Sequence, residues 1–226
     1  MNKVICYPRC CTPKYYSDDY YYFEMFTVPE QKINNVGHVG VQLFKELRKS
    51  KIAPTVEALD FTIIAMAVVA ADKAVLRKKS ADGWTRKIEL CIYLHDAPKW
   101  RQEKRKLEEM LRFLSGDFWV LNINALPESL VPQKKYDLRQ QDCICLLSGG
   151  MDSLVGAIDL HEEGRNPLFV SQTVRGDAEH QREYAMQFGI NNLCQWSNNI
   201  KKKGESEISS KINGLFCFCI IGILWH

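Results

Sequence analysis

The sequence predicts an α/β protein, with an α+β unit at its N-terminus followed by a partial Rossmann-like parallel sheet. Three observations predict this class. Strand and helix patterns follow one another without regular alternation up to residue 125, residues 126–141 are rich in proline and charge, and a strand–helix alternation begins at Asp142. We therefore expect an N-terminal domain of residues 1–125, a linker of residues 126–141, and an incomplete α/β domain of residues 142–226.

The elements expected in the first domain rest on hydrophobic periodicity and on helix-end signals. Thr55 is placed to start a helix, and Gly116 is placed to end one. The expected elements are a strand near Tyr20–Thr27, helices over Gly37–Lys49 and Thr55–Arg77, a strand over Thr85–Leu94, a helix over Pro98–Ser115 and a strand over Phe118–Ile123.

In the second domain, short apolar runs alternate with amphipathic segments. This order is typical of a parallel sheet with connecting helices. The expected elements are strands over Cys143–Leu147, Leu168–Ser171 and Asn192–Trp196, and helices over Asp152–Glu163 and Asp177–Phe188.

Composition excludes several classes of function. The net charge of +3 gives no strong nucleic-acid signal, and the longest apolar run, Phe61–Ala71, is shorter than the roughly 18 residues that span a membrane. No secretory signal opens the chain, so its nine cysteines are expected to be reduced thiols in the cytoplasm. None of them has the CxxC spacing of a zinc site, and we expect no zinc.

The stretch Ser148–Ser153, SGGMDS, joins the first apolar run of the second domain to its helix. Glycines let the backbone turn sharply, and a helix N-terminus offers free amide donors to an anion. Two interpretations fit: a phosphate cradle formed by Ser148, Gly149, Gly150 and Ser153, or a plain glycine turn with a polar helix cap. The complete hexamer after a buried strand favours the phosphate cradle.

Asp152 is the acidic residue of this hexamer, and it would repel a phosphate by itself. We expect it either to cap the helix or to engage Mg²⁺ that the nucleotide carries. The hexamer is neither a GxxxxGK[ST] loop nor a GxGxxG loop, because it lacks the lysine of the first and the spacing of the second.

The hexamer resembles the PP-loop of the N-type ATP pyrophosphatases. The resemblance implies that Ser148, Gly149, Gly150, Asp152 and Ser153 bind ATP, with Asp152 and Ser153 in the reacting centre and Mg²⁺ on the nucleotide. It also implies that Val170, Ser171 and Gln172, at the end of the second strand, hold the adenine by backbone contacts. His180 and Glu183 on the following helix either face the substrate or form a solvated face.

The segment Leu146–Phe188 is most similar to the 7-cyano-7-deazaguanine synthase branch, whose products serve queuosine biosynthesis. Ala70–Leu90 resembles the N-terminal extension of synthase-like proteins of bacterial anti-phage clusters, such as the Qat system. The resemblance covers Asp60 to about Ser197. It implies ATP-dependent adenylation of a 7-carboxy-7-deazaguanine-type carboxylate with release of AMP and pyrophosphate, and in defence the modification of a partner protein.

Family members continue with further strands beyond the point where this sequence ends. We therefore expect a truncated family member, and two alternatives to an active enzyme stay open. One is a non-catalytic nucleotide-binding subunit, and the other is an inactive fragment.

Overall fold

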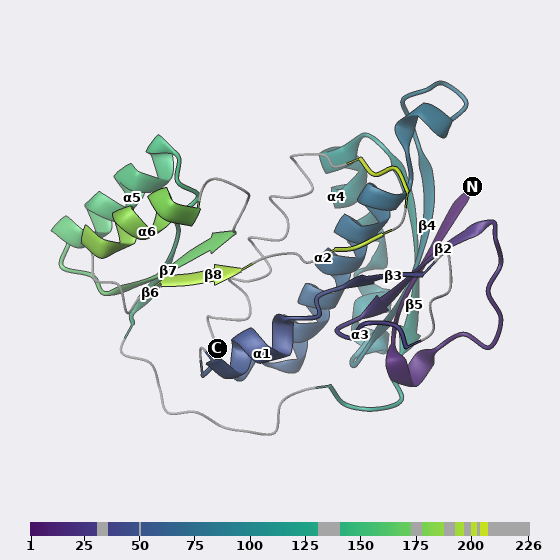
Figure 1. Ribbon diagram of the computed structural model, residues 1–226, viewed down its shortest axis with the longest axis horizontal. Coiled ribbons are helices and arrows are strands. Elements are labelled where there is room, and N and C mark those ends of the chain that lie inside the picture. The colour runs from purple at the N-terminus through teal and green to yellow at the C-terminus, as the bar shows by residue number, and fades with distance from the viewer. Residues whose placement is uncertain are drawn as a thin grey trace.

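Two parallel sheets form the framework of the chain in the computed structural model (Figure 1). The structure describes residues 1–30, 36–49, 51–130, 141–172, 178–187, 193–196, 200–202 and 204–207. The first sheet has the strand order β3-β2-β1-β4-β5. Its strands are β1 (Asn2–Pro8), β2 (Tyr20–Met25), β3 (Val36–Val39), β4 (Lys87–Leu94) and β5 (Phe118–Ala125). The chain is therefore α/β, as the sequence predicts.

The α+β arrangement expected for residues 1–125 is corrected by the structure, because this part of the chain also builds a parallel sheet. All described strand pairings in it are parallel. β1, which the sequence does not predict, lies at the centre and pairs with β2 from Lys3 beside Tyr20 to Pro8 beside Met25. Only residues 9–19 connect these two strands, and the regular structure described there is one 3-10 turn, Arg9–Cys11.

The described helices of the first unit share one hydrophobic core with one face of the five-stranded sheet (Figure 1). They are α1 (Leu43–Lys49), α2 (Val56–Ala74), α3 (Ala97–Gln102) and α4 (Lys104–Ser115). As a result, burial alternates along β4: Ile88 and Leu90 are buried, whereas Lys87 is exposed and Glu89 is half-buried. Parallel sheets are usually covered on both faces, and alternation is typical of antiparallel sheets. The one-sided covering explains why the sequence pattern favours α+β.

The helix predictions in this unit are confirmed in part. The Thr55 hydroxyl caps α2 by accepting a hydrogen bond from the Ala58 amide at 3.2 Å. Gly116 ends α4 with φ of 75°, and the single helix expected over Pro98–Ser115 is divided into α3 and α4. The helix expected over Gly37–Lys49 is wrong in its first part, which forms β3. Position 37 of that strand has no room for a side chain, because an added Cβ would lie only 2.7 Å from the Phe23 ring on the neighbouring strand.

Arginines of the segment Ala70–Leu90 form a buried charge network with Asp117. Arg86 is fully buried, and its backbone amide and Nε donate to the Asp117 carboxylate at 2.9 and 3.1 Å. Arg77 donates to the same carboxylate through two nitrogens, each at 3.0 Å. Burial by itself raises the pKa of Asp117, but the hydrogen bonds and charges of the two arginines outweigh it and lower that pKa. The network joins the end of α2 to the starts of β4 and β5.

The second sheet has three parallel strands in the order β6-β7-β8. These are β6 (Cys143–Leu146), β7 (Pro167–Gln172) and β8 (Leu193–Trp196), with α5 (Met151–Glu162) and α6 (Ala178–Gln187) between them. Both helices lie on one face, where Leu147, Ala157 and Phe169 form a small core (Figure 1). The other face contributes Leu168 and Val170 to the large core of the first unit. All five elements occur where the sequence predicts them, within about two residues.

Beyond β8 the chain returns to the first unit. Lys201 forms an isolated bridge with His38 of β3, and the Lys73 ammonium donates to the Ile200 carbonyl at 3.1 Å. The Glu207 carboxylate accepts from the Arg77 backbone amide at 2.9 Å. No described helix is long and apolar enough to cross a membrane.

Candidate functional site

The hexamer forms a tight turn at the carboxyl end of β6. The strand ends at Leu146, and Leu147 is still anchored in the sheet because its amide donates to the Val170 carbonyl at 2.8 Å. Gly149 has φ of 93°, a conformation that L side chains rarely adopt, and Gly150 is the N-cap of α5. The chain thus reverses within three residues and enters the helix.

The two serines of the hexamer hold this turn together. The Ser148 hydroxyl donates to Ser153 Oγ at 3.0 Å and accepts from the Gly150 amide at 3.3 Å. Ser153 Oγ also accepts from the Ser148 amide at 3.2 Å and donates to the Gly150 carbonyl at 2.8 Å. Both serines are accessible to solvent, so these bonds can exchange for bonds to a ligand at small net cost.

The first turn of α5 has three amide groups that donate to no residue in the part of the chain that the structure describes. No side chain caps the helix, and no described residue accepts from the amides of Met151, Asp152 or Ser153. These groups carry the positive end of the helix dipole. Together with the paired serines, they form a donor-rich turn suited to an anion.

Asp152 lies in this first turn and not at the cap position, because α5 begins at Met151. The expectation that its side chain caps the helix is therefore wrong, since N-capping requires the residue before the helix. Its carboxylate is exposed and makes no hydrogen bond or ion pair with any described residue. The alternative, an interaction with a nucleotide-bound cation, stays a prediction.

The residues expected to hold an adenine lie at the end of the neighbouring strand. Val170 and Ser171 are buried, and the Ser171 hydroxyl donates to the Leu147 carbonyl at 2.6 Å. Gln172, the last residue of β7, is half-buried. Because the side chains of the first two residues face the interior, Gln172 is the one of the three whose side chain reaches the surface.

Gln181 is the residue of this site that the sequence pattern does not reveal. It lies on α6, only 1% exposed, and its side-chain nitrogen donates to the carbonyls of Ser148 and Gln172, each at 3.1 Å. Its side-chain oxygen accepts from Gln195 at 3.1 Å. The sequence signal is a single amide in a polar helix, which also suits a solvated face. Its neighbour Glu183 is exposed, and the side chain of His180 lies outside the described residues.

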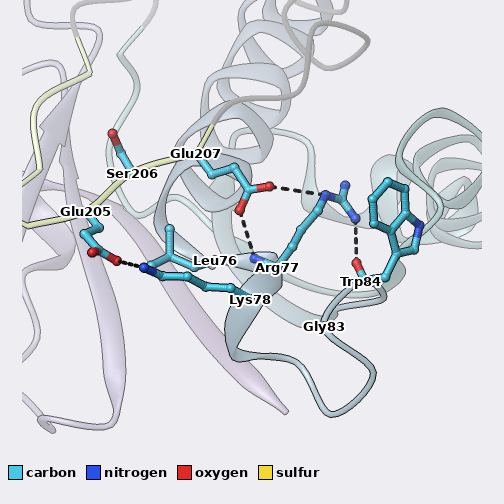
Figure 2. Close-up of a pocket in the computed structure, with 8 residues that line it drawn as sticks. All are labelled: Leu76, Arg77, Lys78, Gly83, Trp84, Glu205, Ser206 and Glu207. Atoms are coloured by element: carbon cyan, nitrogen blue, oxygen red, sulfur yellow. Dashed lines mark hydrogen bonds and ion pairs between the residues drawn. The ribbon is translucent and has the colours of Figure 1, made fainter.

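A hollow of about 500 Å³ on the first unit is a second place where charged side chains gather (Figure 2). Its charges are already paired: the Lys78 ammonium contacts Glu205, and Glu207 accepts from the Arg77 amide. Trp84 forms its opposite wall, and the Arg77 guanidinium lies 5.7 Å from the centre of that ring. We interpret this hollow as the seam where residues 204–207 pack on the first unit.

The cysteines of the described segments are free thiols, and Cys217 and Cys219 lie outside those segments. Among the described residues, no three or more His, Cys, Asp or Glu side chains are grouped to hold a metal ion.

The geometry of the hexamer is thus the feature of the chain that points most directly to a ligand. Comparison with protein-family models, with curated proteins and with solved structures gives no match.

Proposed function

We propose that the chain is an ATP-dependent enzyme of the PP-loop type that adenylates a carboxylate and releases pyrophosphate. The observation that carries the proposal is the turn at Ser148–Ser153. Beyond the carboxyl end of a parallel strand it places two solvent-accessible hydroxyls, the positive end of a helix dipole, and three amides from which no described residue accepts a hydrogen bond. Ligands of parallel sheets bind at this edge, and phosphates bind at helix N-termini.

In the proposed reaction a carboxylate oxygen attacks the α-phosphorus of ATP, and the bond to the pyrophosphate oxygen breaks. The amides of Met151, Asp152 and Ser153 donate hydrogen bonds that stabilise the negative charge developing on pyrophosphate, and the serine hydroxyls also donate to its oxygens. A nucleophile such as ammonia then attacks the acyl carbon, loses a proton and displaces AMP. No side-chain nucleophile is required by this sequence of steps.

Asp152 suits a cation carried by the nucleotide, because its carboxylate is exposed and has no described partner. Mg²⁺ bound there would neutralise phosphate charge. Asp152 would hold the nucleotide in one orientation through that ion, and Gln172 lies on the strand beside the loop where the adenine is expected.

The substrate class follows from the sequence resemblance. We propose a 7-carboxy-7-deazaguanine-type carboxylate and, in a cytoplasmic anti-phage role, a partner protein as the acceptor. These assignments rest on the segments Ala70–Leu90 and Leu146–Phe188.

A second candidate is a subunit that binds Mg·ATP without turnover. One observation favours it: the described side chains that hydrogen-bond to the hexamer backbone or its serines are those of Ser148, Ser153 and Gln181, and none is charged. The two candidates share the ATP site and differ in whether AMP is formed.

The test combines calorimetric titration with Mg·ATP and product analysis. Wild-type chain is compared with Ser153→Ala, Asp152→Asn and the matched control Asp159→Asn, which changes an exposed aspartate on the same helix. We expect Ser153→Ala to weaken ATP binding about tenfold. Asp152→Asn should remove the gain in affinity that Mg²⁺ gives, and Asp159→Asn should match wild type.

AMP and pyrophosphate formed from ATP, 7-carboxy-7-deazaguanine and ammonium would support the enzyme. Binding without AMP supports the binding subunit. A folded chain that does not bind Mg·ATP would overturn both candidates and leave the inactive fragment.

A further inference from the structure

A second cavity lies at the carboxyl edge of the five-stranded sheet, away from the hexamer. Its volume is about 550 Å³, within the range of small-molecule sites. Pro8 and Met25, the last residues of β1 and β2, both line it. Ligands of parallel sheets bind beyond the carboxyl ends of the strands, which is where these two residues lie.

The walls of this cavity are largely apolar and aromatic. Phe26 and Phe44 meet edge to face with ring centres 5.0 Å apart, and Leu130 lies across from the strand ends. Phe26 has φ of 69°, a left-handed conformation that is unfavourable for a bulky residue. The surrounding structure holds it there, since its amide donates to the Val39 carbonyl at 2.8 Å. Strained residues of this kind concentrate at ligand sites.

Arg9 lines the cavity but is not available to an anionic ligand. Its Nε donates to Glu24 at 3.0 Å, and its two terminal nitrogens donate to Glu30 and to the Val28 carbonyl, each at 2.8 Å. Glu24 is itself buried. The guanidinium charge is therefore neutralised by two carboxylates, and its donors point to protein atoms.

Glu128 is the other charged residue that lines the cavity. It is exposed, and no described residue forms a hydrogen bond or ion pair with its carboxylate. The cavity thus combines aromatic walls with one uncompensated negative charge. This pairing attracts an apolar cation and repels phosphates and carboxylates.

We propose that this cavity is a second ligand site, separate from the ATP loop, which takes a small aromatic amine. The ring lies against Phe26, Phe44 and Leu130, and the ammonium group faces Glu128. Because no residue of the hexamer lines the cavity, the proposal is independent of the proposed enzymatic function.

The test titrates the full chain with tryptamine and, separately, with indole-3-propionate, which carries the same ring and the opposite charge. Affinities are measured by calorimetry. We expect tryptamine to bind at least tenfold more tightly. Glu128→Gln should weaken tryptamine about fivefold, the effect of losing one solvent-exposed charge pair. The control Glu162→Gln, an exposed glutamate on α5, should stay within twofold of wild type.

Two variants fill the cavity from different sides. Leu130→Trp enlarges a wall residue, and Cys10→Trp places a large ring at an exposed lining position, so that one remains informative if the other fails to fold. Circular dichroism identifies the folded variants. We expect each folded variant to weaken tryptamine at least tenfold. Equal binding of the two indoles, unchanged binding in a folded filled variant, or no binding of tryptamine to wild type overturns the proposal.

Discussion

The side-chain nitrogen of Gln181 lies 3.1 Å from the carbonyl oxygen of Ser148, the first residue of the hexamer. The same amide group also contacts Gln172 and Gln195. One buried side chain of α6 thus joins the loop after β6 to the last residue of β7 and to β8. Because both acceptors of the nitrogen are carbonyls, the orientation of the amide is fixed. The shape of the loop therefore depends on a helix that follows it by about 30 residues.

Gln181→Met keeps the length of this side chain and removes its hydrogen bonds. We expect the free energy of unfolding to fall by about 1–3 kcal/mol, because two carbonyls lose their donor in a buried position. Mg·ATP affinity should fall about tenfold, since Ser148 is no longer held. Urea unfolding and calorimetry measure the two effects. Glu183→Gln, an exposed change on the same helix, should alter neither. Wild-type ATP affinity in folded Gln181→Met would show that Gln181 does not position the loop.

Gly149→Ala tests the backbone of the turn. With φ of 93°, this position strains any L residue, and an added Cβ would lie 3.6 Å from Gln181 Cγ. We expect a loss of about 1–2 kcal/mol in unfolding free energy and weaker ATP binding. Gly156→Ala is the matched control, because Gly156 lies within α5 with open space around it. It should stabilise the chain by up to about 1 kcal/mol. Equal effects of the two changes would contradict this account of the turn.

Asp117→Asn tests the buried charge network and its pH dependence. The folded-state pKa of Asp117 lies below its usual value of 3.8, so its charge stabilises the fold above that pH and this contribution is lost as pH falls. At neutral pH we expect the variant to lose up to about 3–5 kcal/mol, because buried Arg86 loses one of its two counter-charges and keeps only that of Asp72.

Below about pH 4 the difference between the variant and wild type should shrink. Chemical unfolding at a series of pH values measures it, with exposed Asp159→Asn as the control. A difference that stays constant from neutral to acid pH would assign the loss to packing and not to charge.

Lys51→Gly should stabilise the first unit. Lys51 follows α1 with φ of 52° and is exposed, so glycine removes the strain of a left-handed residue without loss of packing. We expect a gain of about 0.5–1 kcal/mol. Lys45→Gly, an exposed change inside α1, should instead cost about 1 kcal/mol. Thermal unfolding of the two variants compares them, and destabilisation by both would refute the assignment of strain to Lys51.

The sequence predicts the second sheet better than the first, and the reason is connectivity. From Cys143 onward each of the first two strands is followed by a helix that signals a parallel crossover, and the structure confirms each predicted element. In the first unit, β1 pairs with β2 across a short connection without an α-helix, and β4 shows the alternation of a one-sided sheet. Local patterns do not encode which strands become neighbours, so the parallel pairing is not predictable from them.

For the candidate site, the hexamer correctly predicts where the turn lies, because the backbone conformation that glycine allows and the hydrogen bonds that serine makes depend on residues within the turn itself. The Asp152 cap fails by two helical positions, because the N-cap is Gly150, and this lies within the one to two residues by which helix boundaries vary. Gln181 is not predictable in this way, because a glutamine in a polar helix has no sequence feature that marks it as buried. Its role depends on where α6 packs against three strand ends.

The return of the chain to the first unit makes the three-stranded sheet an insertion within a host body, not an appendage at its end. The Lys73–Ile200 hydrogen bond closes a span of 127 residues that contains the whole hexamer region. Closing so long a span costs little more than closing one of half the length, about 0.6 kcal/mol per doubling. The length of the inserted span therefore matters little for closure, whereas its packing matters directly, because Leu168 and Val170 belong to the large core of the first unit. The seam at Arg77 and Glu207 keeps the ends of the span together.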